Sequence, residues 1–138
     1  MPVIKVWCLP VVDEQKIKEL NQYIVRTVIG IGELGVKDEK DITCLFPLDM
    51  MKHSTGSAIV IEVTGLFEKP ERTDEVRQRL AEQLGAVVES LFPATWLVEC
   101  FVYPFNPSQG FWASRGIEVN PYRAFRKLER MLPEIKPR

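Results

Sequence analysis

The stretch Met1-Pro2-Val3-Ile4-Lys5-Val6 decides how the rest of the chain is interpreted. A proline follows the initiator methionine and opens an apolar run that predicts a β-strand. If Met1 is removed, Pro2 becomes a secondary amine at the end of that strand. An α-amine has an ordinary pKa of about 7.7–8.0, which burial or a nearby cation lowers. Such an amine can act as a general base or a nucleophile at neutral pH. If Met1 stays, the Pro2 nitrogen is an amide without basicity, and Pro2 only stiffens the terminus.

The composition favours one cytoplasmic domain. The chain has 138 residues, of which 46% are hydrophobic, enough for a single core. Its 18 Lys and Arg nearly balance its 19 Asp and Glu, so charge indicates neither a nucleic-acid nor a membrane partner. The apolar runs are too short for a bilayer, and we find no signal-peptide pattern. The cysteines Cys8, Cys44 and Cys100 have no metal-binding spacing and are expected to be buried thiols.

Hydrophobic periodicity predicts the order strand–helix–strand twice. Asp13 and Thr73 are expected to cap the two helices at their N-termini. The near-continuous apolar run after Ser57 suggests a strand buried on both faces. The expected strands are residues 2–9, 42–48, 58–66 and 96–103, with a short extra strand at 111–113; the expected helices are 14–29, 74–91 and 121–131.

These elements predict an α+β fold in which two consecutive βαβ units form a four-stranded mixed sheet with two helices on one face. We expect a domain over residues 1–116 and a C-terminal helical extension over residues 117–138. The other sheet face needs a cover. A homo-oligomer supplies it in one interpretation, and the helix after Pro121 supplies it within a monomer in the other.

Several side chains are candidates for binding an anionic substrate. Arg72 directly precedes a helix N-terminus, where a guanidinium and backbone N–H groups can meet a carboxylate. The alternative is a solvated arginine that pairs with Glu71 or Asp74. Lys69 has the same ambiguity, and Arg115 is either a lid over substrate or a solvated loop residue.

Three aromatic residues complete the candidate site. Phe111 and Trp112 would form an apolar wall that lowers the pKa of the Pro2 amine, or they pack against a neighbouring subunit. Tyr103 either donates a hydrogen bond to an enolate oxygen or only packs. His53 is the single histidine, so no metal site is expected.

The chain resembles the tautomerase superfamily, which contains macrophage migration inhibitory factor, 4-oxalocrotonate tautomerase, malonate semialdehyde decarboxylase and the cis-3-chloroacrylic acid dehalogenases. The resemblance is carried by Met1-Pro2-Val3-Ile4, by Ile59-Val60-Ile61-Glu62-Val63 with the helix start after it, and by the aromatic segment 110–116. It covers roughly residues 2–117. No single motif is specific, and the match rests on the placed proline and on the order of elements.

The resemblance implies a homotrimer with Pro2 at the centre of each site and no cofactor. It implies a small anionic carbonyl substrate held by cations. Arg72 matches one of two arginines in the decarboxylase's Arg-Pro-Arg-Thr segment, but Pro70 stands where the other would be, which counts against decarboxylation. The favoured hypothesis is therefore a keto–enol tautomerase with Pro2 as general base. Its rivals are a decarboxylase or dehalogenase, and a non-catalytic binding or assembly protein that retains Met1.

Overall fold

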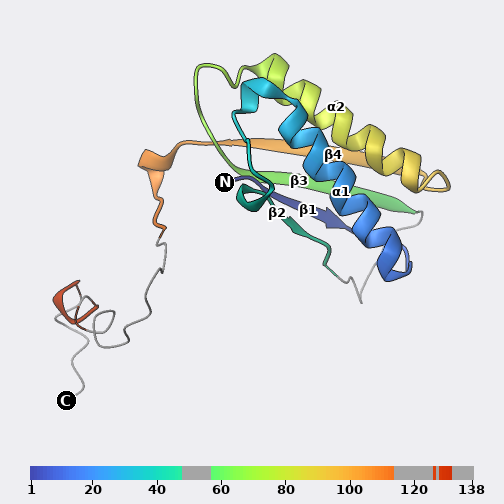
Figure 1. Cartoon of the computed structure of the whole chain (residues 1–138), viewed down its shortest axis with the longest axis horizontal. Helices are drawn as coiled ribbons and strands as arrows, with labels where there is room; N and C mark the ends of the chain where they lie inside the picture. Colours follow the sequence, from blue (N-terminus) through green and yellow to red (C-terminus); the bar gives the residue numbers. More distant parts are fainter. Residues whose placement is uncertain (48–56, 114–125, 127, 132–138) are drawn as a thin grey trace.

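The computed structural model describes residues 1–47, 57–113, 126 and 128–131. In this part of the chain, four strands form one sheet, and two long helices pack on one of its faces (Figure 1). The elements are β1 (Val3–Trp7), α1 (Glu14–Gly30), η1 (Gly32–Leu34), η2 (Glu39–Asp41), β2 (Thr43–Leu45), β3 (Ala58–Phe67), α2 (Asp74–Leu91), β4 (Leu97–Phe105) and η3 (Pro107–Gln109).

The sheet confirms the predicted pair of βαβ units. Its strand order is β2-β1-β3-β4. β1 runs parallel to β2 and β3 parallel to β4, and each parallel pair is joined by one helix. The two units meet where β1 pairs antiparallel with β3, which makes the sheet mixed. This arrangement places the start of β1 in the middle of the sheet rather than at its edge.

Capping and amphipathic spacing explain both helices. An Asp13 carboxylate oxygen accepts a hydrogen bond from the Lys16 amide at 2.8 Å, and the Thr73 hydroxyl accepts one from the Val76 amide at 3.3 Å. These bonds satisfy N–H groups that a helix leaves unpaired in its first turn. Each helix turns one apolar stripe to the sheet. The buried residues of the stripes are Leu20, Ile24 and Val28 in α1 and Val76, Leu80, Leu84 and Val88 in α2.

The second face of the sheet is open, which corrects the expectation that β3 is buried on both sides. Along β3, Ile59, Ile61 and Val63 are buried against the helices, and the residues between them are only half-buried. The sequence of β3 is apolar without alternation at its start because Val60, which lies on the open face between Ile59 and Ile61, is also apolar. Glu62 also lies on that face, where it accepts a hydrogen bond from the Trp7 indole at 2.6 Å.

The chain after β4 differs in part from the prediction. Phe111 to Ala113 form no strand, because the backbone leaves the sheet through η3. Arg126 and residues 128–131 are helical, as expected of the C-terminal extension, and Leu128 and Met131 are exposed. The expected domain boundary at residue 116 lies outside the described residues, so it stays a prediction.

Candidate active site

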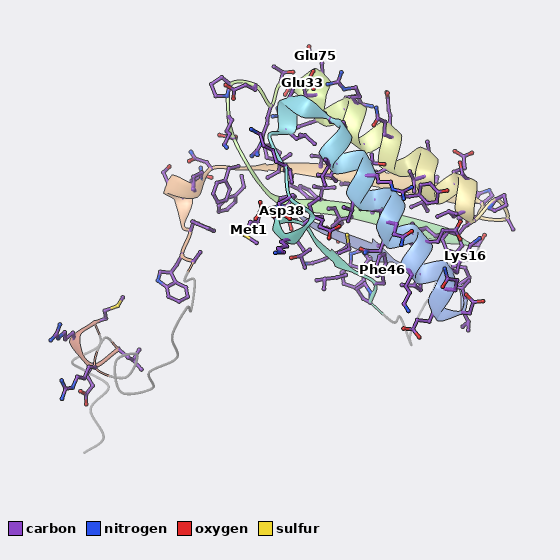
Figure 2. The ribbon with its side chains drawn as sticks, viewed as in Figure 1. Met1, Lys16, Glu33, Asp38, Phe46 and Glu75 are labelled. Carbon is purple, nitrogen blue, oxygen red and sulfur yellow. The ribbon has the colours of Figure 1, made fainter. Side chains whose placement is uncertain are left out.

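Two neighbouring strands hold the start of the chain. Pro2 is buried, and its carbonyl accepts a hydrogen bond from the Thr43 amide, which opens β2, at 3.1 Å. On the other side, the Met1 amine donates to the Gly65 carbonyl of β3 at 3.5 Å. Figure 2 shows Met1 at the beginning of β1. The start of the chain is therefore hydrogen-bonded to the strands on both sides of β1.

A bulge in β3 makes room for this terminus. The register between β3 and β4 shifts between Val63 and Leu66, and Gly65 has a φ of +72°, in the left-handed region. A Cβ atom at position 65 would lie 2.5 Å from the Met1 carbonyl oxygen. Position 65 thus requires glycine for two reasons: its left-handed backbone conformation and the close approach of the terminus.

Arg72 is buried, with 8% of its surface exposed. Its Nε and Nη2 donate to the Leu34 carbonyl at 3.0 and 2.6 Å, and its Nη1 donates to the Phe67 carbonyl at 2.7 Å. It is therefore neither solvated nor, among the described residues, in an ion pair with Glu71 or Asp74. A guanidinium has five N–H groups, so these three bonds leave two for another acceptor. Burial lowers the pKa of Arg72, but an arginine stays charged at any physiological pH.

The charge around the terminus favours a neutral amine. Burial, the positive charge of Arg72 and the weaker effect of Lys69 lower the pKa of the Met1 amine. The carboxylate of Asp41 opposes them. Lys69 is exposed, in the same loop as Arg72. The structure thus brings two of the predicted cations into electrostatic contact with the terminus that carries Pro2.

An aromatic cluster lies beside Arg72. The ring of Phe67 packs edge-to-face on Phe111, with centroids 4.8 Å apart, and lies 5.8 Å from the ring of Phe105. Because Phe67 also supplies a carbonyl to Arg72, Phe111 is joined to the guanidinium through one residue. Trp112 does not join the cluster in the same way, since 74% of its surface is exposed.

The other predicted residues lie elsewhere. Tyr103 is on the open face of β4 and stacks on Phe101 with centroids 6.3 Å apart. β3 separates its strand from β1. Arg115 and His53 lie outside the described residues.

Sequence reasoning missed three residues that shape the site. Gly65 carried a usable signal, because a single glycine inside a strand often marks a bulge or a close backbone approach. Asp41 and Phe67 carried none, since a turn aspartate and an apolar residue at a strand end are common. The electrostatic effect of Asp41 on the terminus depends on β2 lying beside β1 in the sheet.

The described residues contain neither a group of three or more His, Cys, Asp or Glu side chains able to hold a metal ion nor a helix long and apolar enough to cross a membrane. The site has an amine-bearing terminus, a guanidinium held by two carbonyls, an exposed ammonium and, beside Arg72, a cluster of aromatic rings. Such a set can bind a small carboxylate and move a proton next to it.

The fold matches solved structures, although no protein-family model and no curated sequence matches the chain. A native fused 4-OT aligns with a TM-score of 0.62 and 14% identity over 82% of this chain and 94% of that chain. The macrophage migration inhibitory factor of Toxoplasma gondii aligns with a TM-score of 0.61 and 14% identity over 82% and 97%.

A third likeness comes from another branch. The FG41 malonate semialdehyde decarboxylase inhibited by 3-bromopropiolate aligns with a TM-score of 0.58 and 13% identity over 89% of this chain and 96% of that chain. At such identities, the likeness concerns the arrangement of the backbone. The chain therefore has the fold of the tautomerase superfamily.

Proposed function

We propose that this protein is a tautomerase-like enzyme that moves a proton on a small keto or enol carboxylic acid, with Pro2 as the general base once Met1 is removed. One observation carries the proposal. The Pro2 carbonyl is paired with β2 inside the sheet, and burial and the positive charge of Arg72 lower the pKa of the Met1 amine, one residue before the Pro2 nitrogen. A neutral secondary amine in that place is suited to accept a proton from carbon near pH 7.

Arg72 is proposed as the carboxylate anchor. Its two uncommitted N–H groups are held by the bonds to Leu34 and Phe67, so little side-chain entropy would be lost when a carboxylate binds. Lys69 adds a second, exposed cation. Phe111 and Trp112 would limit water at the site, and Arg115 and Tyr103 remain proposed substrate contacts, Tyr103 through a neighbouring subunit.

A homotrimer is part of the same proposal. The open sheet face presents large exposed side chains, among them Leu45, Phe101 and Tyr103, which are 44%, 43% and 45% exposed. A structurally similar fused 4-OT is described as an asymmetric trimer. Burying this face between copies would remove apolar surface from water at about 25 cal/mol per Å².

Ketonisation of phenylenolpyruvate, followed by absorbance, tests the proposal on two forms of the same sequence. One form has Met1 removed, and the other keeps it because methionine aminopeptidase is inhibited during expression; intact mass identifies each. General-base catalysis is worth roughly 10²–10⁴-fold, so we expect at least about a hundredfold more turnover in the form with a free Pro2. No turnover by that form, with malonate semialdehyde and 3-haloacrylates as well, would overturn the enzyme hypothesis. Turnover of either of those substrates alone would assign the decarboxylase or dehalogenase branch instead.

One observation favours the non-catalytic alternative. The Met1 amine donates to the Gly65 carbonyl at 3.5 Å, and the missing Cβ of Gly65 leaves the space that the Met1 carbonyl occupies, so the fold accommodates Met1. With Met1 in place, Pro2 is an amide and the protein would act by binding or assembly alone. The mass of untagged protein from its own host separates the two functions.

A further inference from the structure

A cavity of about 380 Å³ lies at the end of the sheet opposite Pro2. It is lined by the residues that follow β1, the first turn of α1, the start of β3 and the segment from the end of α2 to β4, and it opens to the surface. In Figure 2, Lys16 marks this end of the domain, and Met1 lies toward the other. None of the residues proposed for the Pro2 site lines it.

The walls of this cavity are mainly apolar. Ile59, Leu91, Phe92 and Pro93 contribute to them. Its volume falls at the lower end of the range of about 300–1,000 Å³ typical of small-molecule sites. Among the described residues that line it, none is acidic.

Lys16 gives the cavity its only ammonium group among those residues. The side chain is half-buried, and its Nζ lies 5.6 Å from the centroid of the Phe92 ring. In the described part of the chain, no carboxylate lies within ion-pair distance of this Nζ, whereas Lys18 on the same helix pairs with Glu14 at 3.6 Å. A cation on an apolar wall without a counter-ion is set to recognise an anion, because desolvation strengthens the attraction.

We propose that this cavity binds a monocarboxylate with an apolar tail, with the carboxylate on Lys16 and the tail along Phe92 and Leu91. A single ammonium group matches a single negative charge, and the mainly apolar walls favour a hydrocarbon tail over a sugar or a polyol. This cavity is separate from the Pro2 site, so the proposal does not depend on catalysis at Pro2.

Octanoate is the probe. We expect titration of the full-length protein to move the backbone amide signals of residues around Phe92 and Lys16, and not those around Arg72, in heteronuclear NMR spectra. Lys16→Met is expected to weaken octanoate binding at least about tenfold, which is about 1.4 kcal/mol. Lys18→Met is the matched control, because it removes an exposed lysine two residues away, and it should leave the affinity unchanged.

Two further measurements keep the proposal falsifiable if Lys16→Met perturbs the fold. Lys16→Arg keeps the cation and should retain most of the affinity, and octanol, which keeps the tail without the charge, should bind at least about tenfold more weakly than octanoate. Equal binding of octanol and octanoate, or shifts that map to the Pro2 end, would overturn the proposal. So would an absence of shifts at millimolar octanoate.

Discussion

Replacing Gly65 with alanine tests the geometry at the start of the chain. In the full-length protein, the new Cβ would lie 2.5 Å from the Met1 carbonyl oxygen and 3.5 Å from its carbon. Removing Met1 removes both atoms. The nearest remaining neighbour is then the Val3 nitrogen at 3.8 Å, an ordinary contact. The same substitution should therefore be much more harmful to one form of the protein than to the other.

Two energy terms determine how much Gly65→Ala destabilises each form. A non-glycine residue in the left-handed region costs about 1–2 kcal/mol, and this cost applies to both forms because the φ of Gly65 is +72°. The contact with Met1 is about 0.9 Å too short, and relieving such overpacking costs about 1–3 kcal/mol more. We expect Gly65→Ala to lower the free energy of unfolding by about 2–5 kcal/mol with Met1 and by about 1–2 kcal/mol without it.

Urea unfolding followed by tryptophan fluorescence measures the difference. Both forms must be compared at one protein concentration, because the stability of an oligomer depends on it. Gly35→Ala is the matched control. Gly35 has a φ of +70°, and a Cβ there would meet no atom within 4 Å, so its cost should be about 1–2 kcal/mol in both forms. An equal loss from Gly65→Ala in the two forms would refute the proposed contact between Gly65 and the terminus.

Three other predictions follow from the site and the core. Arg72→Lys should lower the free energy of unfolding by about 2–4 kcal/mol, because it removes charged hydrogen bonds to two carbonyls. Arg79→Lys, in a half-exposed ion pair with Glu33, should lower it much less, and urea titration of the two variants compares them. Burial raises the pKa of Cys100 to about 12, so iodoacetamide at pH 8.5 should alkylate it more than about tenfold faster in urea than in the native protein. Peptide mass spectrometry measures both rates, and equal rates would contradict the burial of Cys100. In the Met1-free form, kcat/KM should rise with pH, since the base must be neutral. Burial and the charge of Arg72, which lower the pKa of the Met1 amine, should bring that rise to a lower pH than an exposed amine would show, and a kcat/KM that falls as the pH rises would exclude a basic Pro2.

Local chemistry explains why the elements of the fold were predictable. Asp13 and Thr73 were expected as helix caps and act as such, because an N-cap depends only on residues within one turn. The paired strand–helix–strand order followed from hydrophobic periodicity. The exposure of one face of β3 did not, because an apolar side chain reads the same whether it meets a helix, a second copy of the chain or water.

The site was less accessible to sequence reasoning. Pro2 and Arg72 were named from their positions beside a strand start and a helix start. The partners that fix Arg72, Leu34 and Phe67, contribute backbone carbonyls, which every residue has. No residue type at positions 34 or 67 signals that role.

The bonds of Arg72 tie the proposed chemistry to the fold. Leu34 belongs to the first βαβ unit, Phe67 ends β3 of the second, and Arg72 directly precedes the cap of α2. The Arg72 guanidinium thus links the two βαβ units by hydrogen bonds at the end of the sheet where Pro2 lies. A loss of turnover in Arg72→Lys would therefore not by itself identify a substrate anchor, because the same change loosens the strands that hold the terminus. Arg72 is identified as the anchor if Arg72→Lys raises KM in Met1-free protein whose unfolding is still cooperative and whose kcat has the same pH profile as the unchanged protein.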